Sequence, residues 1–206
     1  AQNANVKNTA IGGLAGDAIT TGHSNTLVGY AAGSAGTTTD GTPSFNNNTM
    51  VGHQAGMSAA EGGQNTFIGA YSGDAAVTGD DNTCVGYGTG TNLLAGHANV
   101  LMGYNAGSGM TTSTSNIAIG FQAADAMTVL CHNNIAIGRD ALGAQATTQE
   151  GGSLSANPCI AIGSNALLVQ DDADALNIAI GTSAGQAITG GTKNVLIGHE
   201  AGSTLT

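Results

Sequence analysis

The sequence predicts an all-β fold, a parallel β-roll or β-solenoid of about eleven 17-residue coils forming a single domain over residues 1–206. Three observations predict it. The motif N-x-φ-φ-G, in which φ is an apolar residue, recurs eleven times between about residues 8 and 202. Its second and fourth residues are mostly β-branched, which favours strands. The chain has 34 glycines and only 3% aromatic residues, which suits a thin, repetitive core.

The repeat length follows from the motif glycine. Six of the ten intervals between successive motif glycines are 17 residues, two are 18, one is 23 and one is 25. The two long intervals contain the connections 34–47 and 143–158, which hold both prolines of the chain. Because proline cannot donate a hydrogen bond to a strand ladder, its position supports placing these segments outside the strands. The motif glycines are Gly12, Gly29, Gly52, Gly69, Gly86, Gly103, Gly120, Gly138, Gly163, Gly181 and Gly198.

The first motif position is asparagine in ten of the eleven copies, and Cys159 is the exception. Stacked asparagines form amide ladders along the axis of stacked β-structures. We therefore expect such a ladder from Asn8, Asn25, Asn48, Asn65, Asn82, Asn99, Asn116, Asn134, Asn177 and Asn194.

The second and fourth motif positions point to the same side of a strand, because side chains alternate along it. Both positions are almost entirely β-branched, and we expect this side to form the core of the chain. The predicted core residues at the fourth position are Ile11, Val28, Val51, Ile68, Val85, Met102, Ile119, Ile137, Ile162, Ile180 and Ile197.

The third motif position points to the other side and carries neither a charge nor an amide in any copy. A strand that is apolar on both sides is covered on both sides. A 17-residue coil has little chain left for the second cover, so we expect further copies of the chain to supply it. The candidate interface residues are Leu27, Met50, Phe67, Leu101 and Leu196.

The rest of each unit should form a return strand and two turns. The two residues after the motif glycine vary, as in Tyr87–Gly88 and Arg139–Asp140, and should face solvent. A glycine recurs in the connection, where we expect it to supply a positive φ. These turn glycines are Gly22, Gly62, Gly79, Gly96 and Gly191.

Charge and hydropathy exclude several classes of partner. The chain has 13 acidic and 3 basic residues, a net charge of −10, which disfavours nucleic acid and anionic lipid. It has no run of 18 apolar residues, so we expect no membrane insertion. The cysteines Cys84, Cys131 and Cys159 match neither a disulfide framework nor a zinc motif.

We expect no catalytic residue, metal site or cofactor, and hence no enzyme. His23, His97 and His132 each precede a motif asparagine by two residues and could form three-histidine rings in a trimer, but polar turn residues are the simpler interpretation. The acidic segment 171–177 lacks the features of calcium loops. Lys7, Arg139 and Lys193 are scattered over distant coils, so no carboxylate cluster with a basic partner is evident.

The motif N-x-A-I-G-x-x-A resembles the head-domain repeats of trimeric autotransporter adhesins, and similar repeats occur in tail-fibre proteins of phages. The resemblance extends from about Asn8 to Gly202, although the family's usual unit is about three residues shorter. It implies a left-handed parallel β-roll, a homotrimer, and display outside a cell, on a cell surface or on a virion. The chain shows no anchor, coiled-coil stalk or neck motif.

These patterns favour a structural or adhesive extracellular fibre segment that presents its loops to a surface protein or glycan. Neither end shows a polar capping repeat, so the segment either continues in a longer fibre or stacks end to end into a filament. An ice-binding or glycan-binding solenoid is a further alternative. The threonines at the second position, Thr9 to Thr83, stop at Val100 and lack a second threonine column, which makes ice binding the weaker hypothesis.

Overall fold

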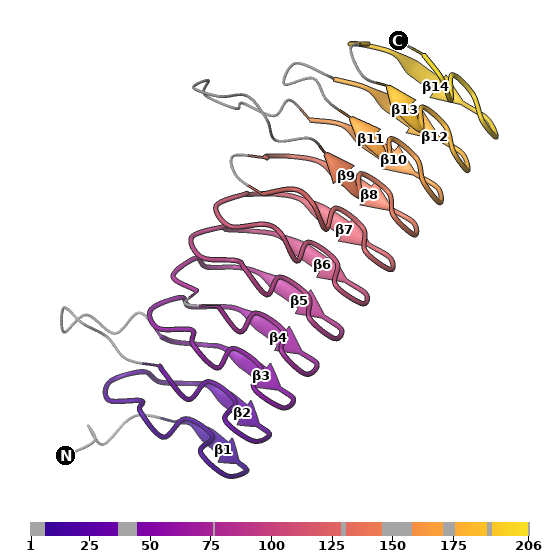
Figure 1. The fold of residues 1–206 in the computed structure, drawn as a ribbon. Coiled ribbons are helices and arrows are strands. Elements are labelled where there is room, and N and C mark those ends of the chain that lie inside the picture. Colours follow the sequence, from indigo (N-terminus) through magenta and orange to yellow (C-terminus); the bar gives the residue numbers. More distant parts are fainter. Residues whose placement is uncertain are drawn as a thin grey trace.

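The computed structural model describes residues 7–36, 45–75, 77–128, 131–145, 158–170, 176–188 and 191–205. They form a parallel β-solenoid with no helix in these ranges (Figure 1). Each motif supplies one three-residue strand, and the eleven strands join into one parallel sheet. In sheet order they are β1 (Thr9–Ile11), β2 (Thr26–Val28), β3 (Thr49–Val51), β4 (Thr66–Ile68), β5 (Thr83–Val85), β6 (Val100–Met102), β7 (Ile117–Ile119), β8 (Ile135–Ile137), β10 (Ile160–Ile162), β12 (Ile178–Ile180) and β14 (Val195–Ile197).

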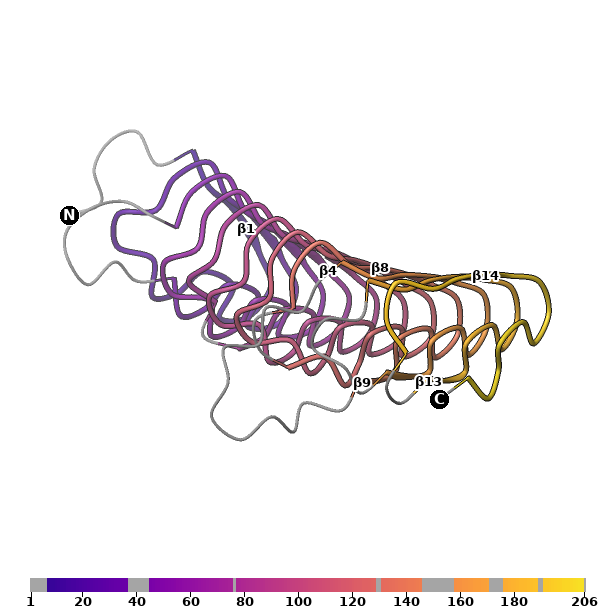
Figure 2. The ribbon, with the colours of Figure 1, turned by 90° about the horizontal axis from the view of Figure 1, so that it is seen from above.

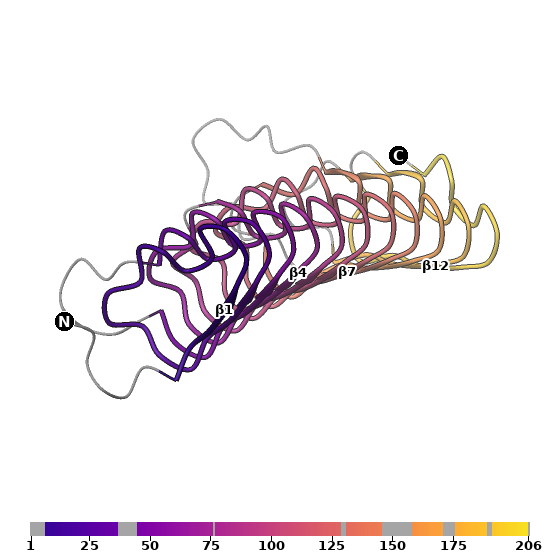
Figure 3. The same ribbon diagram turned by 90° about the horizontal axis from the view of Figure 1, so that it is seen from below.

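The register of the sheet matches the motif at every step. Each residue pairs with the residue at the same motif position in the next coil, as Thr49 does with Thr66 and Met50 with Phe67. The same register holds across both long connections, between β2 and β3 and between β8 and β10. The strands follow one another along one side of the stack, and the coils turn gradually from one end to the other (Figures 2 and 3). The predicted 17-residue coil is therefore confirmed.

The structure reverses the predicted roles of the two strand faces. Leu27, Met50, Phe67 and Leu101, predicted to lie at an interface, are completely buried inside their own coil, and Leu196 packs against the same core. The predicted core residues point outward. Ile11, Ile68, Met102, Ile180 and Ile197 are exposed, and Val28, Val51, Val85, Ile119, Ile137 and Ile162 are half-buried.

The error has a physical cause. Alternation along a strand separates the two faces but does not say which one points inward. Because both faces are apolar here, only β-branching distinguished them. β-branched residues suit a packed outer face as well as they suit the core. The inside of the coil instead takes the third motif position, where residue size varies most.

The core is filled jointly by the third motif position and the residue six places after it. In coils with a large third residue the facing residue is glycine, and a Cβ at Gly33 or Gly73 would overlap Leu27 or the ring of Phe67. In the coils of β8 and β10 the third residue is Ala136 or Ala161, and buried leucines, Leu142 and Leu167, occupy the facing position. All of these facing residues have φ between 46° and 57°. In these coils the large core residue therefore comes from either the strand or the facing segment, and the opposite position is small.

A regular return strand forms in only part of the described chain. β9 (Ala144–Gln145), β11 (Val169–Gln170) and β13 (Ala187–Ile188) make a parallel three-stranded sheet on the side opposite the main sheet. In the earlier coils the return segment still bonds from coil to coil, as Gly33 N–H does to the carbonyl of Ala55 at 3.0 Å. The recurring left-handed residues there interrupt an extended strand. The prediction of two strands per coil holds only for these later coils.

The predicted asparagine ladder is confirmed, and its members from Asn25 to Asn134, together with Asn177, are almost completely buried. In a typical member, Asn82, the side-chain oxygen accepts the backbone N–H of Asn99 at 3.1 Å. Its side-chain nitrogen donates to the carbonyl of Gly96 at 2.8 Å, within its own coil. Each amide therefore ties one coil to the next and closes the turn of its own coil. The Cys159 backbone N–H still donates to Asn134 Oδ1 at 2.9 Å, but its thiol supplies no amide.

The glycines serve two purposes. The motif glycines have φ from 125° to 141°, a region that other residues rarely adopt. The turn glycines were expected to have positive φ, and this was wrong for Gly22, Gly62, Gly79, Gly96 and Gly191. They are required for close approach, because a Cβ at Gly79 would overlap the carbonyl oxygen of Gly96 in the next coil.

The three cysteines form no disulfide with one another, and all three are buried. Burial raises the pKa of the Cys84 thiol to about 12 and that of Cys131 to about 11. They therefore act as small apolar core residues at neutral pH. Within the described ranges, no helix is long and apolar enough to cross a membrane.

Candidate functional site: the outer face and the aromatic file

The outward side of the main sheet forms a continuous surface, here called the outer face. It consists of the second and fourth motif residues of all eleven strands, which lie in register from coil to coil. The second-position residues are Thr9, Thr26, Thr49, Thr66, Thr83, Val100, Ile117, Ile135, Ile160, Ile178 and Val195, and the fourth-position residues are the outward side chains named above. All are half-buried or exposed, because each is shielded only by its neighbours in the adjacent coils.

The outer face changes chemistry halfway along the solenoid. From β1 to β5 the second position is threonine, so hydroxyl groups alternate with isoleucine or valine across each strand. From β6 to β14 both positions are aliphatic in every strand, as in Ile135 and Ile137 of β8. The second half of the outer face is therefore an uninterrupted aliphatic surface.

Beside the outer face runs a row of aromatic rings, here called the aromatic file. It consists of Tyr30, His53, Tyr71, Tyr87, Tyr104 and Phe121, one from each coil from β2 to β7. Successive ring centroids are 5.2–5.6 Å apart. Three of the five neighbouring pairs are stacked, and the two pairs that include Tyr71 are edge-on. Tyr30, Tyr87, Tyr104 and Phe121 are 46–51% exposed.

The two residues after the motif glycine were predicted to face solvent, which is correct for Tyr87 and Arg139 but wrong for Gly88, which is buried against the next coil. The file was not predicted from the sequence. The signal was present, because Tyr30, Tyr87, Tyr104 and Phe121 all directly follow a motif glycine. Tyr71 stands one place later and His53 is not a typical aromatic residue, which interrupts the pattern in the sequence. In space their rings continue the row.

The three histidines that share a repeat position make polar contacts at the turns, and two of them bond to the preceding coil. His97 Nδ1 accepts the backbone N–H of Asp80 at 3.0 Å, and His132 Nδ1 accepts that of Thr114 at 3.2 Å. His23 Nδ1 lies 3.3 Å from Ser24 Oγ. These contacts fit the interpretation as polar turn residues. Over the described ranges, no group of three or more histidine, cysteine or acidic residues could hold a metal ion.

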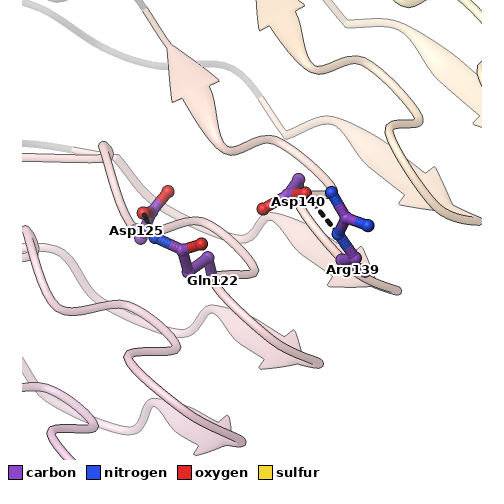
Figure 4. Close-up of polar contacts among 4 residues, drawn as sticks. All are labelled: Gln122, Asp125, Arg139 and Asp140. Carbon is purple, nitrogen blue, oxygen red and sulfur yellow. Dashed lines mark hydrogen bonds and ion pairs between the residues drawn. The ribbon is translucent and has the colours of Figure 1, made fainter.

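Figure 4 shows the polar contacts of four residues that follow the motif glycines of β7 and β8. Arg139 Nε is 2.8 Å from Asp140 Oδ2. Gln122 Nε2 donates to Asp125 Oδ2 at 3.3 Å. Partial burial, followed by repulsion from Asp140, raises the pKa of the Asp125 carboxyl. Lys7 and Lys193 lie in other coils, so these basic residues do not converge on one site.

Three segments, the acidic segment 171–177 and the two long connections, lie largely outside the described residues. Of the acidic segment 171–177, only Leu176 and Asn177 are described. The long connections are described only at 34–36, 45–47, 143–145 and 158. No protein-family model, curated protein or solved structure matches the chain.

Proposed function

We propose that this chain is a structural segment of a multi-chain extracellular fibre, in which copies of the chain pack together through the outer face. The observation that carries the proposal is the aliphatic half of that face, which continues without a polar residue from β6 to β14. The resemblance to adhesin head repeats supports three chains, a left-handed roll and a position on a cell or virion surface. The loops and the residues after the motif glycines would then present the adhesive surface.

A parallel sheet needs other elements packed against both of its faces. Parallel sheets are normally buried on both faces, and contiguous exposed apolar surface marks a site of association. Here the third motif position satisfies the inner face within one chain, whereas the outer-face residues remain half-buried or exposed among the described residues. Copies of the chain are therefore proposed to associate through the second and fourth positions and no longer through the third.

The molar mass in solution, measured by light scattering over a dilution series, tests the proposal. We expect a stable mass three times that of one chain. The double variant Ile137→Glu/Ile162→Glu places two charges in the aliphatic half and should give a monomer with an unchanged circular dichroism spectrum. Thr192→Glu, which adds a charge at an exposed residue outside the outer face, is the control and should remain trimeric.

A monomeric wild-type chain would overturn the multi-chain proposal. Assemblies that are not disrupted by the glutamates and grow with concentration would instead favour end-to-end stacking through the edge strands β1 and β14. A trimer whose mass is insensitive to the Ile137 and Ile162 changes would place the interface elsewhere.

The threonine half of the outer face favours a second candidate, binding to ice. Thr9, Thr26, Thr49, Thr66 and Thr83 form an in-register row beside a row of isoleucine and valine. Such a chain would produce thermal hysteresis, and Thr49→Lys/Thr66→Lys would abolish it. The absence of hysteresis in the wild-type chain would remove this candidate and leave the fibre proposal unaffected.

A further inference from the structure

We propose that the aromatic file is a binding track for a neutral, extended polysaccharide that lies along the solenoid axis. This inference deepens the adhesive part of the fibre proposal, because most members of the file directly follow a motif glycine. It uses none of the outer-face residues through which the chains are proposed to pack, so binding and assembly can fail independently. It rests on how the aromatic residues are allocated, on the spacing of the rings, and on the charge around them.

The allocation of aromatic residues points to a surface role. The chain has no tryptophan, four tyrosines and three phenylalanines. Phe45 and Phe67 are completely buried in the core. The other five, all four tyrosines and Phe121, stand in one row with His53. Every tyrosine or phenylalanine that the core does not use therefore belongs to the file.

The spacing of the rings suits an extended sugar chain. The centroids advance by 5.2–5.6 Å per coil over six coils, which is comparable with the length that one pyranose adds to an extended β-linked glycan. The solenoid repeat thus offers one ring to each successive sugar. A polymer with a matching period can contact all six rings without bending back on itself.

The exposed parts of the rings provide the right contacts. Neighbouring rings at this separation are offset, because rings in full face-to-face contact would lie closer. About half of the surface of Tyr30, Tyr87, Tyr104 and Phe121 consequently remains open. Ring carbons can pack against the C–H faces of a pyranose, while the tyrosine hydroxyl groups can exchange hydrogen bonds with sugar hydroxyl groups.

The charge of the surroundings selects a neutral ligand. The chain carries a net charge of −10, which repels anionic polymers. Arg139 is the one lysine or arginine that directly follows a motif glycine, and its Nε pairs with Asp140 at 2.8 Å. Binding through ring contacts and neutral hydrogen bonds should depend little on ionic strength.

Titration with cellohexaose and chitohexaose tests the track, with calorimetry and tyrosine fluorescence as the two readouts. Since the chain has no tryptophan, its emission reports the file directly. We expect one of these oligosaccharides to bind, affinity to rise with oligosaccharide length up to about six units, and little change between low and high salt. The variant Tyr87→Leu/Tyr104→Leu keeps apolar side chains at both places and should weaken binding at least tenfold.

Two controls separate binding from folding and assembly. His199→Ala changes an exposed residue at the same repeat position but outside the file, and should leave affinity unchanged. Circular dichroism and molar mass of the tyrosine variant should match those of the wild-type chain. No binding of any neutral hexasaccharide at millimolar concentration, or equal affinity in the double variant, would overturn the proposal. Binding confined to anionic glycans at low salt would also overturn it.

Discussion

The coils of β2 to β6 and the coils of β8 and β10 fill the same cross-section from opposite sides. In β2 to β6 the strand supplies the core with Leu27, Met50, Phe67, Cys84 and Leu101, and the facing residue is glycine. In β8 and β10 the strand supplies alanine, and Leu142 and Leu167 fill the space from the return side. The difference teaches that a large core residue can come from either side of the coil, so that the identity of any one position is free to change.

The largest expected effects come from breaking this exchange. Phe67→Ala should lower the free energy of unfolding by about 3–5 kcal/mol, because it leaves a cavity in a completely buried site. Gly73→Leu should cost about 3 kcal/mol, because its side chain would overlap the Phe67 ring and would also adopt φ near 56°. Denaturant unfolding measures both.

The double variant Phe67→Ala/Gly73→Leu gives this coil the composition of the coil of β8. We expect it to recover most of the lost stability, so that the double-mutant cycle shows a favourable coupling of at least about 2 kcal/mol. Additive losses would mean that the two positions do not share one core volume. Phe67→Ala combined with Leu142→Gly, two changes in distant coils, is the control and should be additive.

The asparagine ladder offers a second comparison, between an intact coil and the interrupted one. Asn82→Ala removes a buried amide that bonds both Asn99 and Gly96, and should cost about 3 kcal/mol. Cys159→Asn should instead raise the free energy of unfolding by about 1 kcal/mol, because it restores the amide that the other ten coils carry. Cys159→Ser, which adds a polar group without an amide, should give no gain. A loss with Cys159→Asn as large as with Asn82→Ala would show that this coil cannot accommodate the ladder.

How far the sequence predicts this molecule depends on what each pattern encodes. The motif glycines fix the coil length and the register, and the asparagines predict the ladder, because both features repeat with the coil. The direction of the strand faces could not be predicted from β-branching, since Val28 and Leu27 are equally apolar. The exchange of glycine for leucine opposite the third position, as at Gly73 and Leu142, was the available signal. This exchange couples two positions of the repeat, so it is visible only when both positions are compared across the coils.

The aromatic file required the structure for a different reason. Its members at Tyr30, Tyr87 and Tyr104 share one repeat position, but Tyr71 reaches the row from the next position. A backbone repeat predicts where Cα atoms lie, whereas the contacts between rings depend on the direction in which each side chain points. The site therefore depends on geometry that the spacing of the motif does not contain.

The smallest expected effects come from two aspartates, one in each half of the solenoid. Asp74 and Asp125 are both half-buried, and desolvation raises the pKa of each, but only Asp125 also faces a second carboxylate, Asp140. A pKa raised by folding means that the protonated form is favoured in the folded chain. The resulting stability is present below the ordinary carboxyl pKa and is lost as the pH rises through the raised value. At pH 7 both groups are therefore mildly destabilising.

Asp125→Asn should raise the free energy of unfolding at pH 7 by about 0.5 kcal/mol, a value discounted for the solvent that reaches the group. Asp74→Asn should give a smaller gain, because it removes desolvation alone. Both gains should vanish near pH 3, where the wild-type carboxyls are protonated, and added salt should reduce only the excess of Asp125 over Asp74. Thermal unfolding at pH 3 and pH 7, at low and high salt, measures these differences. Equal gains for the two variants at low salt would show that Asp140 exerts no repulsion across the coils, and that burial alone sets the behaviour of Asp125.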